Sequence, residues 1–190
     1  MDRSSLTDDP LAHGEESAGN AVPGLTLPLF ATMIERIPYW RILEGVLFHF
    51  DKKRPFLFLM LKRLGIARFD RAGPAARFLA RSLRQTASHL DALEKQLAES
   101  KGPWILGESF TLADVSWLVI LERLLQVDCI DVFMGSDRPA CTAYWNRLRA
   151  RPAHREAILD HANEIVEFGT QRLQQTKAAD AKLRLLLEGG

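Results

Sequence analysis

The sequence is poor in the residues that build disulfide frameworks and metal centres. Its 190 residues include two cysteines, Cys129 and Cys141, which stand twelve positions apart without a Cys-x-x-Cys pair. We interpret them as reduced thiols in a cytoplasmic protein, not as a disulfide or a metal site. The five histidines are scattered, and His154 and His161 lie a heptad apart without a third ligand. No metal site is therefore expected.

An excess of one charge and long apolar runs are also missing. The 25 basic and 24 acidic residues leave a formal net charge of +1, which gives no indication of a nucleic-acid partner. The N-terminus is acidic and polar, where a secretory signal would need a basic and then an apolar run. The longest apolar run, residues 56–61, is ended by Lys62 and Arg63, far short of a membrane span. A cytoplasmic location is expected.

Alternation of apolar and polar residues, the pattern of a half-buried strand, appears nowhere at useful length. We therefore predict an all-α bundle of about six helices. Pro38 should interrupt an apolar segment over 28–50, and Pro55 and Gly65 should begin and end the next helix.

The clearest helix follows Pro74. Its apolar positions alternate spacings of four and three and so form one seam: Leu79, Leu83, Thr86, Leu90, Leu93 and Leu97. Further helices are expected over 112–126, 138–149 and 152–174. The first of these is apolar nearly all round, which is typical of a helix at the centre of a bundle.

Composition divides the chain into three parts. Residues 1–24 carry five acids against one base, with little apolar periodicity, so we interpret them as disordered or as a linker remnant. A helical domain is predicted over 25–175. Residues 176–190 form a tail in which a frayed helix is an open alternative.

A helix start is encoded between Phe110 and Val115. Thr111 fits the N-cap position, and Asp114, three residues on, can bond back to the Thr111 N–H and complement the positive end of the helix. Phe110 and Val115 are spaced to pack as a hydrophobic staple. Each such device contributes about 1 kcal/mol.

The surroundings of this motif resemble a known family. Trp104–Gly107 followed by Phe110-Thr-Leu-Ala-Asp114, and then Arg138-Pro139 and the segment 144–152, are similar to the all-helical C-terminal domain of glutathione S-transferases. Within that family the pattern is nearest to the branch with reductive dehalogenases and ganglioside-induced differentiation-associated proteins. The resemblance implies that Thr111 and Asp114 define the fold and take no part in catalysis.

The family binds glutathione on an N-terminal thioredoxin-like domain, which also supplies the catalytic Ser, Cys or Tyr. The 24 residues before the first expected helix show no strand-like pattern. We therefore expect no catalytic and no cofactor-binding residue in this chain, with glutathione bound only if a thioredoxin-like domain is supplied elsewhere. A mis-set start codon, a split gene and true domain loss remain open explanations.

The resemblance also implies a wall for a hydrophobic ligand. Tyr39, Trp40 and Arg41 would face that ligand, with Trp117 deeper; ordinary core packing is the alternative for each aromatic. The expected function is a transferase-family protein that is non-catalytic alone and contributes a surface for a hydrophobic small molecule or a partner.

Two further hypotheses concern that partner. The chain would be a homodimer or bind a companion protein through its first helices. Peripheral membrane attachment is the other hypothesis, because residues 28–72 mix aromatics and leucines with basic residues. A bundle helix with a solvated basic face is the favoured interpretation, so a membrane partner is not expected.

Overall fold

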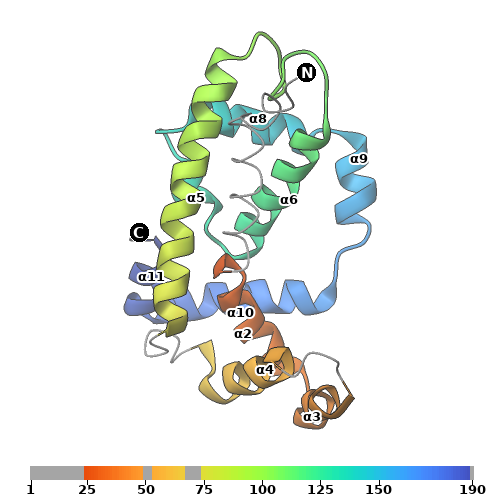
Figure 1. Ribbon diagram of the computed structural model, residues 1–190, viewed down its shortest axis with the longest axis vertical. Coiled ribbons are helices and arrows are strands. Elements are labelled where there is room, and N and C mark those ends of the chain that lie inside the picture. The colour runs from red at the N-terminus through yellow and green to blue at the C-terminus, as the bar shows by residue number, and fades with distance from the viewer. Residues whose placement is uncertain (1–23, 49–52, 67–73, 189–190) are drawn as a thin grey trace, which may run out of the picture.

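The computed structural model describes residues 24–48, 53–66 and 74–188, and in these ranges the protein is built from helices. A single isolated bridge between Trp104 and Gly107 is the only β-type pairing found in this part of the chain. The predicted all-α fold is confirmed there. Figure 1 shows the long α5 (Pro74–Glu99) running beside α6 (Leu112–Gln126), with α8 (Pro139–Arg149) across one end and α10 (Glu164–Ala179) across the other. No helix in the described ranges is long and apolar enough to cross a bilayer.

The first helices break where proline predicts. The apolar segment 28–50 is divided into α2 (Leu27–Met33), the short 3₁₀ helix η1 (Ile34–Arg36) and α3 (Tyr39–Phe48). Ile37 is extended, with ψ of 124°, because the ring of Pro38 disfavours a helical residue before it. Next comes α4 (Lys53–Leu64), which begins two residues before Pro55. Gly65 ends it at φ +67°, its N–H bonded to Leu61 O at 2.8 Å.

The seam of α5 forms the middle of the core. All six of its predicted seam positions are buried, as expected: Leu79, Leu83, Thr86, Leu90, Leu93 and Leu97. The helix α8 packs against α5 and is held there at its first turn. The Glu94 carboxylate accepts hydrogen bonds from the N–H groups of Ala140 (2.9 Å) and Cys141 (2.7 Å), two free donors at the start of α8. Between α6 and α8 lies the short α7 (Ile130–Met134).

The prediction of one continuous helix over 152–174 is wrong. The segment 152–174 begins as α9 (Pro152–His154), continues as the π-helical η3 (Arg155–Leu159), and then leaves the helix for several residues before α10. The break has a local cause. The side chain of Asn163 accepts the Ile165 N–H at 2.9 Å and caps a new helix, which competes with continuation of the old one.

The redirected helix α10 packs against α2. Thr32 Oγ1 donates to the carbonyl of Gly169 at 2.8 Å, and both residues are buried. The helices approach closely at this point: a Cβ at Gly169 would lie 2.5 Å from Met33 Cγ. Glycine is therefore required here by space rather than by its backbone angles.

The C-terminal residues also pack on the bundle. The helix α11 (Ala181–Glu188) buries Leu183 and Leu187. Lys177 ties it down, because its ammonium lies 2.8 Å from Asp128 Oδ2 and 2.9 Å from Glu188 Oε1. The predicted linker remnant 1–24 lies outside the described residues except for its last position, and the predicted domain limits at 25 and 175 remain predictions.

Candidate functional site

Thr111 and Asp114 meet at the start of α6. Thr111 is the N-cap and Asp114 the third helical residue, and the two form a capping box. The Thr111 N–H donates to Asp114 Oδ2 at 2.8 Å, and the Thr111 hydroxyl donates to the same oxygen at 3.1 Å. The Phe110 ring packs edge-on against Trp104, with the Arg151 guanidinium 3.7 Å from its centroid. Val115 is 40% exposed, and its staple contact with Phe110 stays a prediction.

Asp114 does more than cap its own helix. Its second oxygen, Oδ1, accepts the Ile105 N–H at 3.2 Å and the Tyr144 hydroxyl at 2.9 Å, and the carboxylate is fully buried. Burial and the Asp114 charge raise the pKa of Tyr144. The carboxylate therefore joins α6, the loop before it and α8. Both carboxylate oxygens are thus used in bonds within the fold, and the structural role of Thr111 and Asp114 stays a prediction.

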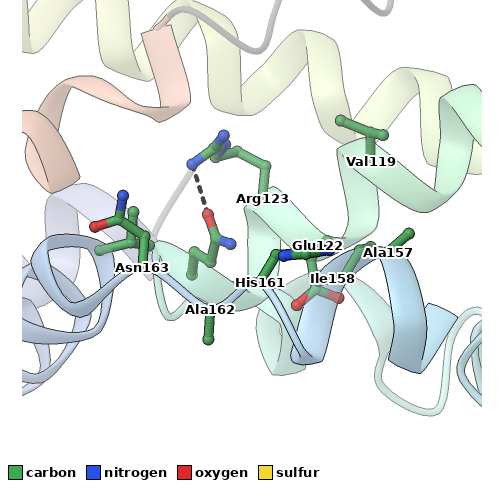
Figure 2. Close-up of a pocket in the computed structure, with 10 residues that line it drawn as sticks. Val119, Glu122, Arg123, Ala157, Ile158, His161, Ala162 and Asn163 are labelled. Carbon is green, nitrogen blue, oxygen red and sulfur yellow. Dashed lines mark hydrogen bonds between the residues drawn. The ribbon is translucent and has the colours of Figure 1, made fainter.

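A groove opens elsewhere on α6, where the helix is less covered than its apolar sequence predicts. It runs between α6 and the segment from η3 to the start of α10 and has a volume of about 260 Å³. Figure 2 shows Val119, Glu122 and Arg123 on the α6 side and Ala157 and Ile158 on the η3 side. The lining is completed by Gln126, His161, Ala162, Asn163 and Val166.

A buried acid–base pair supports the floor of this groove. Glu122 Oε2 lies 3.2 Å from His154 Nε2, and both residues are buried. The indole of Trp145 stands edge-on to the His154 ring with centroids 6.2 Å apart. The other ring nitrogen of His154, Nδ1, is buried and has no hydrogen-bond partner in the described ranges. The pair fixes the Glu122 carboxylate at the groove by holding one of its oxygens.

Arg123 supplies the positive charge of the groove. Its Nη1 donates to Gln126 Oε1 at 2.5 Å, as Figure 2 shows, and no carboxylate among the described residues forms an ion pair with it. Burial lowers the pKa of Arg123, and the charge of Glu122 acts in the opposite direction. A guanidinium that is partly desolvated and short of acceptors can bind an acidic oxygen strongly.

The residues expected to form a ligand wall do not come together. Tyr39, Trp40 and Arg41 lie on the surface of α3, while Trp117 is buried in α6. Figure 1 shows α3 beyond α4 at the end of the molecule away from the first turns of α6. Their assignment to a ligand wall stays a prediction. The groove residues Glu122, Arg123 and His161, and His154 behind Glu122, were missed, although a charged pair inside an apolar helix is a usable signal.

The two thiols are poor nucleophiles. Cys129 and Cys141 are both buried and free of a disulfide. Burial raises the pKa of Cys129 to about 12, and burial together with the neighbouring Glu94 raises the pKa of Cys141 further. In the described ranges, no three His, Cys, Asp or Glu side chains are grouped as metal ligands would be.

Comparison with known proteins places part of this geometry in a family. Residues 66–147 match the family model described as glutathione S-transferase, C-terminal domain. This range contains α5, the capping box and most of α8. The family resemblance predicted from Thr111, Asp114 and the Arg138-Pro139 pair is confirmed.

The curated relatives agree with the predicted dehalogenase branch. Over 68 residues the chain is 43% identical to 2,5-dichlorohydroquinone reductive dechlorinases from two strains of Sphingobium indicum, which covers 35% of this chain and 20% of each relative. Over 62 residues it is 36% identical to tetrachloro-p-hydroquinone reductive dehalogenase of Sphingobium chlorophenolicum, 33% of this chain and 23% of the relative. The match thus spans about a fifth of the length of these relatives. No solved structure matches the chain.

Proposed function

We propose, from the premise that residues 66–147 form a glutathione S-transferase C-terminal domain, that this chain binds an aromatic ligand and does not conjugate glutathione by itself. In this proposal the ligand is a planar molecule with an acidic hydroxyl, and the α6 groove is its site. Activation of glutathione would fall to a thioredoxin-like domain supplied elsewhere, in the cytoplasm.

The observation that carries the proposal is Arg123 beside an apolar wall. Val119 and Ile158 offer the apolar surface that a flat ring needs, and Arg123 offers a charged donor for a phenolate oxygen. The Glu122 carboxylate, held by His154, can accept a hydrogen bond from a second hydroxyl. The curated relatives are named for chlorinated hydroquinones, which have a flat apolar ring with two hydroxyl groups.

The thiols support the non-catalytic part. A cysteine acts as a nucleophile through its thiolate, and the raised pKa values of Cys129 and Cys141 keep both protonated near neutral pH. Neither is therefore suited to attack an electrophile.

Calorimetric titration of the full chain with 2,5-dichlorohydroquinone, under anaerobic conditions, tests the ligand site. We expect saturable binding by the natural chain and a loss of about 10- to 100-fold in affinity for Arg123→Gln, because a hydrogen bond to a charged group contributes about 1.5–3 kcal/mol. Arg184→Gln, which changes an exposed arginine of α11, is the matched control. Absence of binding, or equal binding by Arg123→Gln, refutes the site.

A separate measurement tests catalysis. The chain alone, mixed with reduced glutathione and the same dichlorohydroquinone, should release no chloride. Chloride release would refute the non-catalytic part of the proposal, and calorimetric binding of glutathione by the pure chain would refute the assignment of glutathione to a domain supplied elsewhere.

A further inference from the structure

Charge is strongly segregated along this nearly neutral chain. Residues 36–84 contain twelve lysines and arginines but three acidic residues, whereas the whole chain has a net charge of +1. The basic segment includes α3, α4 and the first part of α5. Among its described side chains, Arg63, Arg77, Arg81 and Arg84 are exposed. In the described ranges this segment therefore contributes exposed basic side chains on α4 and the first part of α5, and the rest of the sequence carries the compensating negative charge.

Large apolar side chains are exposed at the same end. Tyr39, Trp40 and Leu43 are between 49% and 57% exposed, and their spacing places them along one side of α3; we call them the α3 strip. Phe48 at the end of α3 and Phe56 in α4 are more exposed still. Figure 1 shows α3 and α4 together at the lower extremity of the molecule, where this surface can reach a flat partner.

The α3 strip is held in a defined orientation. The Lys62 ammonium of α4 donates to the carbonyl of Ile34 at 2.9 Å and to that of Glu35 at 3.2 Å. It also donates to the carbonyl of Ile37, directly before α3, and lies 4.8 Å from the Tyr39 ring centroid. These bonds satisfy the free carbonyl groups at the end of η1 and tie α3 to α4. The α3 strip is therefore held facing solvent and cannot turn toward the core.

We propose that this end of the molecule docks on an anionic lipid bilayer. The α3 strip would enter the boundary between headgroups and acyl chains, where tyrosine and tryptophan are favoured because they combine an apolar ring with a polar atom. The exposed arginines of α4 and of the first part of α5, which lie toward the same end of the molecule, would lie at the lipid phosphates. Since no described helix can span a bilayer, the attachment is interfacial.

Charge repulsion disfavours a second copy of this chain as the partner that covers this surface. In a two-fold symmetric dimer the same patch meets itself, which would bring two strongly basic ends together. Nucleic acid would satisfy the charge, but it offers no apolar phase for Leu43 and Phe48. An anionic lipid surface offers both a negative charge for the arginines and an apolar phase for the exposed side chains. The exposure of the α3 strip therefore reverses the preference for a merely solvated basic face that the sequence alone favours.

Vesicle co-sedimentation of the full chain tests the assignment. We expect the protein to pellet with phosphatidylcholine vesicles containing phosphatidylserine, and to stay in solution with pure phosphatidylcholine or in high salt. Leu43→Glu should reduce binding at least tenfold. Leu159→Glu is the matched control, because Leu159 is 48% exposed and Leu43 is 49% exposed; it should bind like the natural chain.

A second variant isolates the electrostatic part. Arg77→Gln combined with Arg81→Gln should lower binding to the anionic vesicles about 25-fold, since each basic residue near the surface contributes about fivefold. Circular dichroism of every variant establishes that it is folded. The assignment is overturned by absence of pelleting with anionic vesicles, or by equal pelleting of Leu43→Glu. It is also overturned by a dimer in light scattering that Leu43→Glu dissociates, or by RNA binding that depends on Leu43.

Discussion

Replacing Asp114 by alanine tests how much one buried carboxylate holds together. The change removes the acceptor of four hydrogen bonds, from Thr111 N, Thr111 Oγ1, Ile105 N and Tyr144 Oη. Ile105 and Tyr144 are buried, so water cannot replace the lost partner. Each buried donor left unsatisfied costs about 1–3 kcal/mol, and loss of a cap costs about 1 kcal/mol more.

With two such donors and the cap, the sum is roughly 3–7 kcal/mol in the free energy of unfolding. For a chain of this size, 1 kcal/mol shifts the melting temperature by about 2–4 °C. We therefore expect Asp114→Ala to melt about 10 °C below the natural protein. A carboxylate that served only as the acceptor of a capping box would shift the melting temperature by a few degrees.

Urea and thermal unfolding followed by circular dichroism measure the difference. Asp131→Ala is the control, because Asp131 is an exposed acid in the first turn of α7 and should contribute at most about 0.5 kcal/mol. A cycle with Tyr144→Phe isolates the bond to α8, and we expect a coupling free energy of about 1–2 kcal/mol. A loss below about 1 kcal/mol for Asp114→Ala, or no coupling with Tyr144, would refute the bridging role.

Two further predictions concern packing and alkaline pH. Gly169→Ala should destabilise the protein by about 1–3 kcal/mol in urea unfolding, because its Cβ would meet Met33 Cγ at 2.5 Å; Met33→Ala in the same chain should restore part of the loss. Burial raises the pKa of Cys129 from 9.0 to about 12, so above pH 9 the unfolded thiol loses its proton while the folded one keeps it. Stability should then fall as pH rises from 9 to 12, by about 1.4 kcal/mol per pH unit for this group, and unfolding curves of Cys129→Ala should show a shallower fall.

Local patterns predict the parts of the fold whose causes are local. The seam of α5 repeats over six positions, so its buried face can be read directly from spacing. The break at Pro38 follows from one ring and its neighbour, and the end of α4 from the positive φ of Gly65. The capping pair Thr111 and Asp114 can also be predicted from local sequence, since its two members are three residues apart.

Contacts between distant residues are a different matter. Asp114 and Tyr144 are separated by 30 residues, and nothing in either local pattern predicts that their side chains meet. The exposure of Trp40 and Leu43 is also a tertiary property. An apolar segment is expected to be buried, and only the arrangement of α3 beyond α4 shows that one side of it is left on the surface.

The groove and the error over segment 152–174 have one origin. A continuous helix through this segment would carry no loop beside α6. The cap at Asn163 instead ends one helix and starts another, and the turn between them contributes His161, Ala162 and Asn163 to the groove lining. A capping asparagine followed by Glu164 is a weak signal in sequence, because the same residues are tolerated within a helix at modest cost. The choice between the two is made by α10 packing on α2 through Gly169, a contact that only the folded chain reveals. The site could therefore be found from sequence only by predicting that helix pair first.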